Sequence, residues 1–212
     1  MSLLSRVHSA QVHPRRVRVL ARHLCELIPA NVSVLDVGSG DGLLASRVLA
    51  HRSDLKWLAI DPLARPKTHI PVQLFEGDKL PFADNAFDFV VFVDVLHHTD
   101  APMALLREAI RVARAGIVIK DHLREGFCAG PTLRFMDWFG NAAWGVRLPY
   151  NYWDAAQWKS AREQLDLRTE EERIALGLYP FWANWLFGRS LHFIARLRVP
   201  CGETLARTAN SL

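Results

Sequence analysis

Hydrophobic positions along the chain follow two periods, one typical of helices and one typical of buried strands. Residues 14–29 place Val17, Leu20, Leu24 and Ile28 on one face, which predicts an amphipathic helix. Short, almost uninterrupted apolar runs follow, as expected for strands of a parallel sheet that is covered on both faces. They predict strands at 33–37, 55–60, about 71–75, 87–95 and 117–120.

Helical segments separate these predicted strands. One follows the first strand and carries Leu44, Val48 and Leu49. Another is expected to be capped by Asp100, to hold Pro102 in its first turn and to end at Gly116. This alternation predicts an α/β fold, a Rossmann-like three-layer sandwich with a mostly parallel sheet and helices on both faces.

The composition changes after Asp121, where aromatic residues replace the regular alternation. We expect no regular element over 121–153, then a helix at 154–165 and strands at 167–176 and 190–197. The whole chain, 1–212, is predicted to be one domain. Its parts are an N-terminal helix at 1–30, a core at 31–120, an aromatic insertion and helix at 121–168, closing strands at 169–197 and a tail at 198–212.

Composition limits the class of protein. The chain has 212 residues, of which 50% are apolar and 23% charged, so collagen-like, coiled-coil and disordered classes are excluded. The net charge is +4. Its densest cluster, Arg15, Arg16, Arg18 and Arg22, is expected to be a solvated helix face rather than a phosphate-binding patch. No apolar run reaches the roughly 18 residues that span a bilayer, and a cytoplasmic protein is expected.

Three cysteines without paired spacing predict neither a disulfide framework nor a zinc site. No metal is predicted. Cys128 is expected to be a packing residue rather than a nucleophile.

The strongest chemical signal is a glycine-rich turn between a strand and a helix. Gly38, Gly40 and Gly42 follow the apolar run Val34-Leu35-Asp36-Val37, so backbone N–H groups can approach a ligand closely there. The order GxGxG differs from the GxGxxG of dinucleotide-binding folds, which argues against a nicotinamide oxidoreductase. Asp61 comes at the end of the second strand, where a carboxylate can accept both hydroxyls of a ribose.

These motifs resemble those of class I S-adenosylmethionine-dependent methyltransferases, specifically the small-molecule type with an LDVGxGxG first motif. The similarity covers about residues 31–120. It includes Leu80-Pro81-Phe82, Phe87-Asp88 and Asp94-Val95-Leu96-His97-His98. The family's sheet has seven strands with an antiparallel last one, which accounts for the two late strands predicted here.

The resemblance implies that residues 31–120 bind S-adenosyl-L-methionine. The methionine half would contact Asp36, Gly38, Ser39 and Gly40, and Asp61 would hold the ribose. Pro62, Gly77, Asp78 and Lys79 would border the adenine, and Asp94 and Val95 would lie beneath the sulfonium end. Only Lys79 separates Asp78 from Leu80, whereas relatives commonly have two or three residues there, so this segment is expected to be shortened.

The implied reaction is methyl transfer to a small, apolar or aromatic metabolite by in-line displacement, which depends mainly on positioning and exclusion of water. His122 and His98 are the candidates for a base, should the acceptor carry a proton, and His97 is a weaker one. The aromatic insertion is expected to cover the acceptor or to form a local hydrophobic subcore. Its candidate substrate residues are Arg134, Trp138, Tyr150 and Tyr152, and Asp137 and Asn151 are further polar candidates to orient the acceptor.

Other partners are less favoured by the sequence. Asp94-Val95-Leu96-His97 stands where methyltransferases of DNA bases carry NPPY or DPPY, so DNA is not expected. RNA is an alternative acceptor because of the basic N-terminal helix, although no RNA-binding module is visible. A non-catalytic binding or scaffold protein is the other alternative. The stretch 178–187 could extend the pocket, or contact a membrane surface or a partner; the oligomeric state stays open.

Overall fold

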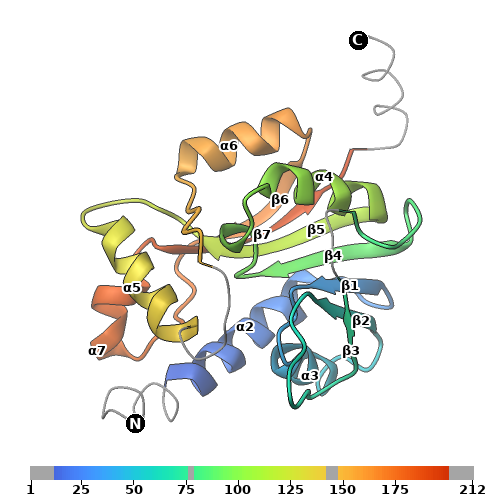
Figure 1. The fold of residues 1–212 in the computed structure, drawn as a ribbon, viewed down its shortest axis with the longest axis horizontal. Coiled ribbons are helices and arrows are strands. Elements are labelled where there is room, and N and C mark those ends of the chain that lie inside the picture. Colours follow the sequence, from blue (N-terminus) through green and yellow to red (C-terminus); the bar gives the residue numbers. More distant parts are fainter. Residues whose placement is uncertain (1–11, 76–78, 142–147, 201–212) are drawn as a thin grey trace.

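The computed structural model describes residues 12–75, 79–141 and 148–200, and a seven-stranded sheet forms its centre (Figure 1). The strand order is β3-β2-β1-β4-β5-β7-β6. β7 runs antiparallel to both β5 and β6, and the other neighbours pair in parallel. This confirms the predicted sheet. The strands are β1 (Ser33–Val37), β2 (Lys56–Asp61), β3 (Val72–Leu74), β4 (Phe87–Val93), β5 (Ala113–His122), β6 (Arg168–Arg173) and β7 (His192–Arg198).

Helices cover both faces of the sheet, which makes three layers. α4 and α6 lie on one face, and α2 and α3 lie on the other (Figure 1). α5 and α7 lie next to each other beyond the ends of the strands, where β5 ends and β7 begins (Figure 1). The helices are α2 (His13–Leu27), α3 (Leu43–Leu49), the 3-10 turn η2 (Leu96–His98), α4 (Pro102–Val112), α5 (Ala129–Asn141), α6 (Ala155–Gln164), α7 (Phe181–Ala183) and the π-helical turn η3 (Asn184–Gly188).

Side chains of successive residues in the central strands pack into two separate hydrophobic cores. In β4, Val90 and Phe92 pack beneath α4, whereas Phe89 and Val91 pack against α2. Side chains alternate across a strand, so burial on both faces requires apolar residues at nearly every position. This explains the continuous apolar run of β4.

Two predicted boundaries of α4 are wrong. The residue at the N-cap is Ala101 rather than Asp100, and the helix already ends at Val112. Gly116 lies inside β5, where a Cβ atom would come within 2.6 Å of the Leu197 carbonyl oxygen. Glycine is therefore needed here because the two strands approach closely, and it does not end the helix.

The aromatic insertion contains a helix, α5, which the sequence pattern did not predict. Its buried residues Ala129 and Leu133 pack with Tyr152 and Leu191 in a small third core. Their partners are distant in the sequence, so the local pattern alone could not reveal this packing. Trp144 lies outside the described residues.

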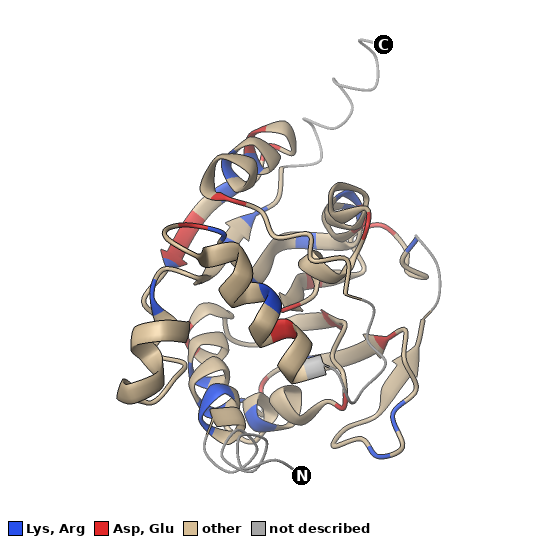
Figure 2. Cartoon of the chain, turned by 60° about the vertical axis from the view of Figure 1, so that its left-hand side comes forward, with Lys and Arg blue, Asp and Glu red and all other residues tan. Residues whose placement is uncertain are grey.

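Basic residues of α2 lie near the N-terminal end of the described chain (Figure 2). They divide between the interior and the surface. Arg15, Arg18 and Arg22 are exposed, whereas Arg16 is half-buried and points inward. Residues 1–11 of the predicted N-terminal segment and 201–212 of the predicted tail lie outside the described part. Within the described ranges, no helix combines the length and apolar character needed to cross a membrane.

Candidate functional site

The glycine turn, residues 38–42, follows β1 and opens α3. Gly38, Gly40 and Gly42 have φ values of 76°, 63° and 73°, which glycine adopts without the steric cost of a Cβ atom. The N–H groups of Gly38 and Ser39 donate to the Ile60 carbonyl at 2.8 and 3.1 Å, so the turn is held against the end of β2. Among the described residues, no heavy atom lies within 4 Å of a Cβ built on Gly40. The turn is therefore rigid and open at Gly40.

Two buried carboxylates support this turn. Asp61 accepts hydrogen bonds from the Gly40 and Leu63 N–H groups, both at 2.8 Å. Asp36 accepts one from Nε1 of Trp57 at 3.2 Å. Burial, opposed by this hydrogen bond and reinforced by the charge of Asp61, raises the pKa of Asp36 to about 7. Both residues predicted from the first motif thus lie at or beneath the turn.

A cavity of about 580 Å³, which we call the strand-end cavity, opens between the glycine turn and the carboxyl ends of β4 and β5. α2, the segment 65–69 and α5 complete its walls. Ligands of open α/β sheets bind at this edge, outside the carboxyl ends of the strands. Of the predicted residues, Gly40, Asp94, His97, His98 and His122 line the cavity.

Asp94 lies at the centre of a charged cluster in this cavity. Arg16 donates to its carboxylate at 2.9 Å, and Lys120, which is fully buried, forms an ion pair with it. Nε2 of His122 lies 3.7 Å from Oδ1 of the same carboxylate. Although burial opposes its charge, Lys120 and Arg16 hold the pKa of Asp94 well below its usual range. The charge cluster predicts a solvated face for Arg16, but Arg16 precedes Leu20 by one helical turn and shares its buried face.

A second cluster lies deeper, around His97. Its Nδ1 contacts Oδ1 of Asp121 at 2.6 Å, and its ring stacks on Tyr152 at 5.4 Å between centroids. Burial disfavours its charge, but Asp121 and Asp137 outweigh this and raise the pKa of His97 to about 10. Burial together with the positive charge of His97 lowers the pKa of His98 and holds that of His122 well below its usual range.

The four predicted substrate residues do not line the strand-end cavity. Tyr152 is buried and donates its hydroxyl to Asp137 at 2.9 Å, and Arg134 lies over the ring of Tyr150 at 5.4 Å. Trp138 is 54% exposed. α5 reaches the cavity through a different face of the helix, formed by Met136, Asp137 and Gly140. The helical period would have separated these two faces, had the helix itself been recognised.

The predicted adenine-binding residues are only partly described. Pro62 and Lys79 are exposed near the end of β2 and after β3, respectively. Gly77 and Asp78 lie outside the described residues.

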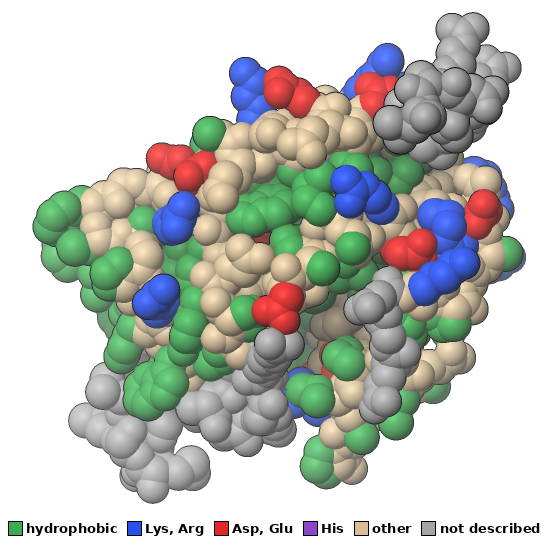
Figure 3. All heavy atoms as spheres, turned by 45° about the horizontal axis from the view of Figure 1, so that its top comes forward, with side chains coloured by type: hydrophobic (Ala, Val, Ile, Leu, Met, Phe, Trp, Pro, Cys, Tyr) green, Lys and Arg blue, Asp and Glu red, His purple; other side chains and the backbone are tan. Residues whose placement is uncertain are grey.

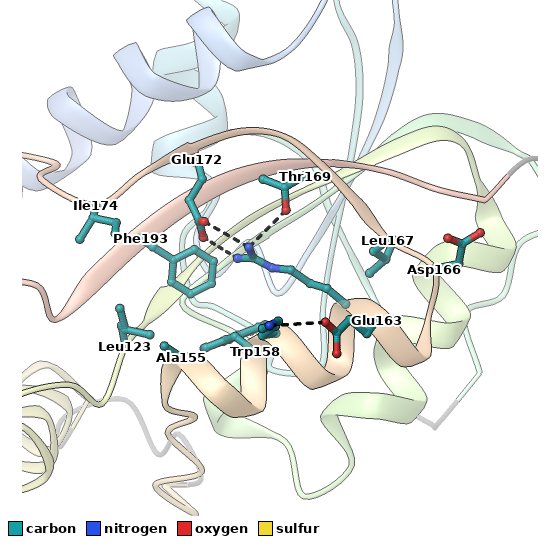
Figure 4. Close-up of a pocket in the computed structure, with 12 residues that line it drawn as sticks. Leu123, Ala155, Trp158, Glu163, Asp166, Leu167, Thr169, Glu172, Ile174 and Phe193 are labelled. Atoms are coloured by element: carbon teal, nitrogen blue, oxygen red, sulfur yellow. Dashed lines mark hydrogen bonds and ion pairs between the residues drawn. The ribbon is translucent and has the colours of Figure 1, made fainter.

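A separate cavity of about 650 Å³ lies between α6 and the strands β6 and β7 (Figure 4). Arg162 crosses it to Glu172 and Thr169, and Trp158 and Phe193 form its apolar floor. None of the predicted site residues that the structure describes lines this cavity. Arg162 is already paired with Glu172 and Lys159 with Glu163, and the cavity lies away from the glycine turn.

Large apolar side chains are exposed on α5, the loop before it and the α7–η3 segment, at the left edge of the molecule (Figure 3). They form a surface that is distinct from the strand-end cavity. Its members are Phe127, Phe135, Trp138, Phe181, Trp182, Trp185 and Leu186.

Comparison with known proteins agrees with this geometry. Residues 35–119 match the family model of the methyltransferase domain. Over these residues the chain is therefore similar to methyltransferase domains. An uncharacterized methyltransferase of Mycolicibacterium gilvum is 35% identical over 95 residues. That match covers 41% of this chain and 36% of the relative, so the chain spans only about a third of that relative's length.

Solved structures share the methyltransferase fold with this chain. A S-adenosylmethionine-dependent methyltransferase from Aquifex aeolicus superimposes with a TM-score of 0.60 at 20% identity, over 88% of this chain and 94% of the other. A chain of a complex that contains the Haloferax volcanii Trm112 methyltransferase activator gives a TM-score of 0.62 at 14% identity, over 90% and 92%. At these identities the likeness concerns the fold alone.

Proposed function

We propose that this methyltransferase transfers a methyl group from S-adenosyl-L-methionine to a small-molecule acceptor in the strand-end cavity. The observation that carries the proposal is the position of the open glycine turn on the same cavity as Asp94, His98 and His122. The cavity volume of about 580 Å³ falls in the range of small-molecule sites.

The residues around the turn fit the methyl donor. Oγ of Ser39 is buried and has no hydrogen-bond partner among the described residues, so it is available to a ligand. Gly40 leaves space that a Cβ atom would fill. Bound there, the cofactor supplies an electrophilic methyl group on a positively charged sulfur. Asp61 fixes the turn through Gly40, and its carboxylate is our candidate to accept the ribose hydroxyls.

The residues that line the acceptor side of the strand-end cavity favour an acceptor molecule with a polar group. Ionisable side chains from α2, the segment 65–69 and the ends of β4 and β5 line most of the cavity, and Val17, Leu20 and Met136 are its main apolar contacts. This favours an aromatic or apolar skeleton that carries a hydroxyl or an acidic group. His122 is the candidate to accept its proton, because its ring lines the cavity at the end of β5.

The alternative functions have weaker support. A protein that no longer transfers methyl groups would be expected to have lost parts of the glycine turn, Asp61 or Asp94, and all of them are present. An RNA acceptor would favour a continuous basic surface. Instead, Arg16 is directed into the cavity and is paired with Asp94.

Isothermal titration with S-adenosylhomocysteine, S-adenosylmethionine and NADH tests the cofactor. We expect micromolar binding of the two sulfur ligands, no heat from NADH, and loss of binding in Asp61→Ala. Asp84→Ala is the matched control, because that carboxylate is 72% exposed and lies outside the cavity. If folded protein gives no heat of binding with either S-adenosylhomocysteine or S-adenosylmethionine, the proposal is wrong. Once binding is established, labelled methyl transfer identifies acceptors.

A further inference from the structure

We infer that His97, His98 and Asp137 form a binding site for a divalent transition-metal ion of the zinc class on the acceptor side of the strand-end cavity. Nothing in the sequence predicted it, since no cysteine is involved. His97 and His98 come from η2 and Asp137 comes from α5, about forty residues later. Only the fold brings the three together.

The possible donor atoms of the three residues lie close together. Nε2 of His97 lies 3.7 Å from Oδ1 of Asp137, and Nε2 of His98 lies 3.5 Å from the same oxygen. One ligand atom from each of the three residues lies within 4.8 Å of the other two. An ion bound about 2.0–2.2 Å from each atom needs separations close to these. Two imidazoles and one carboxylate are donors that Zn²⁺ and similar ions accept.

Groups behind two of the donors already orient them. Asp121 contacts Nδ1 of His97 at 2.6 Å and is itself held by the N–H groups of Leu96 and His122 at 3.0 and 2.7 Å. A carboxylate on one ring nitrogen that leaves the other toward the ion is the usual support of a metal-binding histidine. Tyr152 supports Asp137 in the same way, by donating to Oδ2 while Oδ1 faces the imidazoles.

An independent observation concerns Nε2 of His97. This atom is buried and has no hydrogen-bond partner among the described residues, while the residue as a whole is 2% exposed. A buried polar atom without a partner costs free energy. A metal ion between His97, His98 and Asp137 would satisfy it. Sharing a proton between His97 and the two carboxylates is the competing explanation, and the test below distinguishes the two.

The site opens into the strand-end cavity, which all three residues line. Three protein ligands leave a further coordination position, as in catalytic rather than structural sites. An oxygen of the acceptor would occupy that position, and the ion would lower the pKa of an acceptor hydroxyl. This last step rests on the proposed methyl transfer, whereas ion binding does not. His98 is then a metal ligand and not a base.

The test is titration of the full chain, freed of metal with a chelator and returned to chelator-free buffer. We expect one Zn²⁺ per chain by calorimetry, one Co²⁺ with a visible absorption band typical of low-coordinate sites, and no heat from Mg²⁺. His98→Gln and Asp137→Asn should abolish this binding. Tyr152→Phe keeps all three ligands and should lower the Zn²⁺ affinity about 10- to 100-fold.

Two histidines outside the triad serve as matched controls. His51 is exposed away from the cavity, and His69 lines another part of it. His51→Ala and His69→Ala should bind one Zn²⁺ as the unmodified chain does. Unchanged binding in His98→Gln and Asp137→Asn, no binding in the unmodified chain, or an unchanged affinity in Tyr152→Phe would overturn the inference.

Titration of the same samples with S-adenosylhomocysteine separates the two proposals and reports whether each variant is folded. Binding of S-adenosylhomocysteine without binding of Zn²⁺ would leave the proposed function standing and reject the metal site. Binding of Zn²⁺ without S-adenosylhomocysteine would do the opposite.

Discussion

A Cβ atom on Gly38 would lie 2.6 Å from Cγ2 of Val95. Gly38 follows β1 and Val95 follows β4, and these strands are parallel neighbours, so the glycine turn and the loop after β4 meet at one edge of the sheet. The closeness of the two residues links the first motif of the chain to the segment that carries the histidines. It also makes Gly38 necessary for two reasons, its positive φ and the absent side chain.

Gly38→Ala should lower the free energy of unfolding by about 2–4 kcal/mol, the sum of left-handed strain and overpacking against Val95. Urea unfolding measures it. Gly177→Ala is the matched control, because Gly177 has a φ of 66° and no heavy atom of the described residues lies within 4 Å of its Cβ position. That variant should lose only about 1–2 kcal/mol. Equal losses in the two variants would show that the Val95 contact is unimportant.

Gly40→Ala separates ligand binding from stability. Its φ of 63° and open surroundings match those of Gly177, so its stability loss should equal that of Gly177→Ala. Gly40 lines the strand-end cavity, whereas Gly177 does not. Titration with S-adenosylhomocysteine should therefore show at least about tenfold weaker binding in Gly40→Ala, which corresponds to about 1.4 kcal/mol. Equal affinities in the two variants would contradict the assignment of Gly40 to the cofactor.

Asp36 should make the protein less stable as the pH rises. Its pKa is about 7 in the folded protein and 3.8 is its ordinary value, so between these pH values the folded state binds more protons than the unfolded state. Stability is then lost as the pH rises from about 4 to about 7. Asp36→Asn should remove this loss, on the order of a few kcal/mol between pH 4 and pH 8.

Urea unfolding across that pH range measures the effect, with Asp84→Asn as the exposed control. A pH profile of Asp36→Asn parallel to that of the unmodified protein would show that Asp36 is ionised at low cost.

The ion pair of Asp94 and Lys120 should be strongly coupled. Lys120 is fully buried, and Asp94→Asn removes the charge that compensates it, at a cost of about 3–5 kcal/mol. Lys120→Met should cost less, because Arg16 remains 2.9 Å from Asp94.

The double variant should lose less free energy of unfolding than the two single variants lose together. Chemical denaturation of the four proteins gives the coupling energy. A coupling energy near zero would mean that Lys120 is uncharged in the folded protein.

Much of the fold followed from local patterns. The apolar runs at 33–37, 55–60 and 87–95 predicted β1, most of β2 and all of β4, because strands buried on both faces need apolar residues throughout. The glycine order and Asp61 predicted the turn, since only glycine adopts the required φ values there without strain.

Other features depended on residues that are distant in the sequence. α5 is stabilised by Tyr152 and Leu191, which lie beyond the helix in the chain. Arg16 lies in the cavity because Asp94 and Lys120 follow neighbouring strands.

The sequence by itself determined the order of the strands, the helices α2, α3, α4 and α6, the glycine turn and the position of Asp61 at the end of β2, because each depends on backbone geometry and burial within a few residues. Only the tertiary structure decided which side chains share the cavity. His97 and His98 lie near Asp137 because α5 packs beyond the ends of β4 and β5. Some aromatic residues of the insertion are buried in the small third core, and others are exposed on the surface. Which side chains come together depends on how the helices and strands pack, and that packing is determined by contacts between residues that are distant in the sequence.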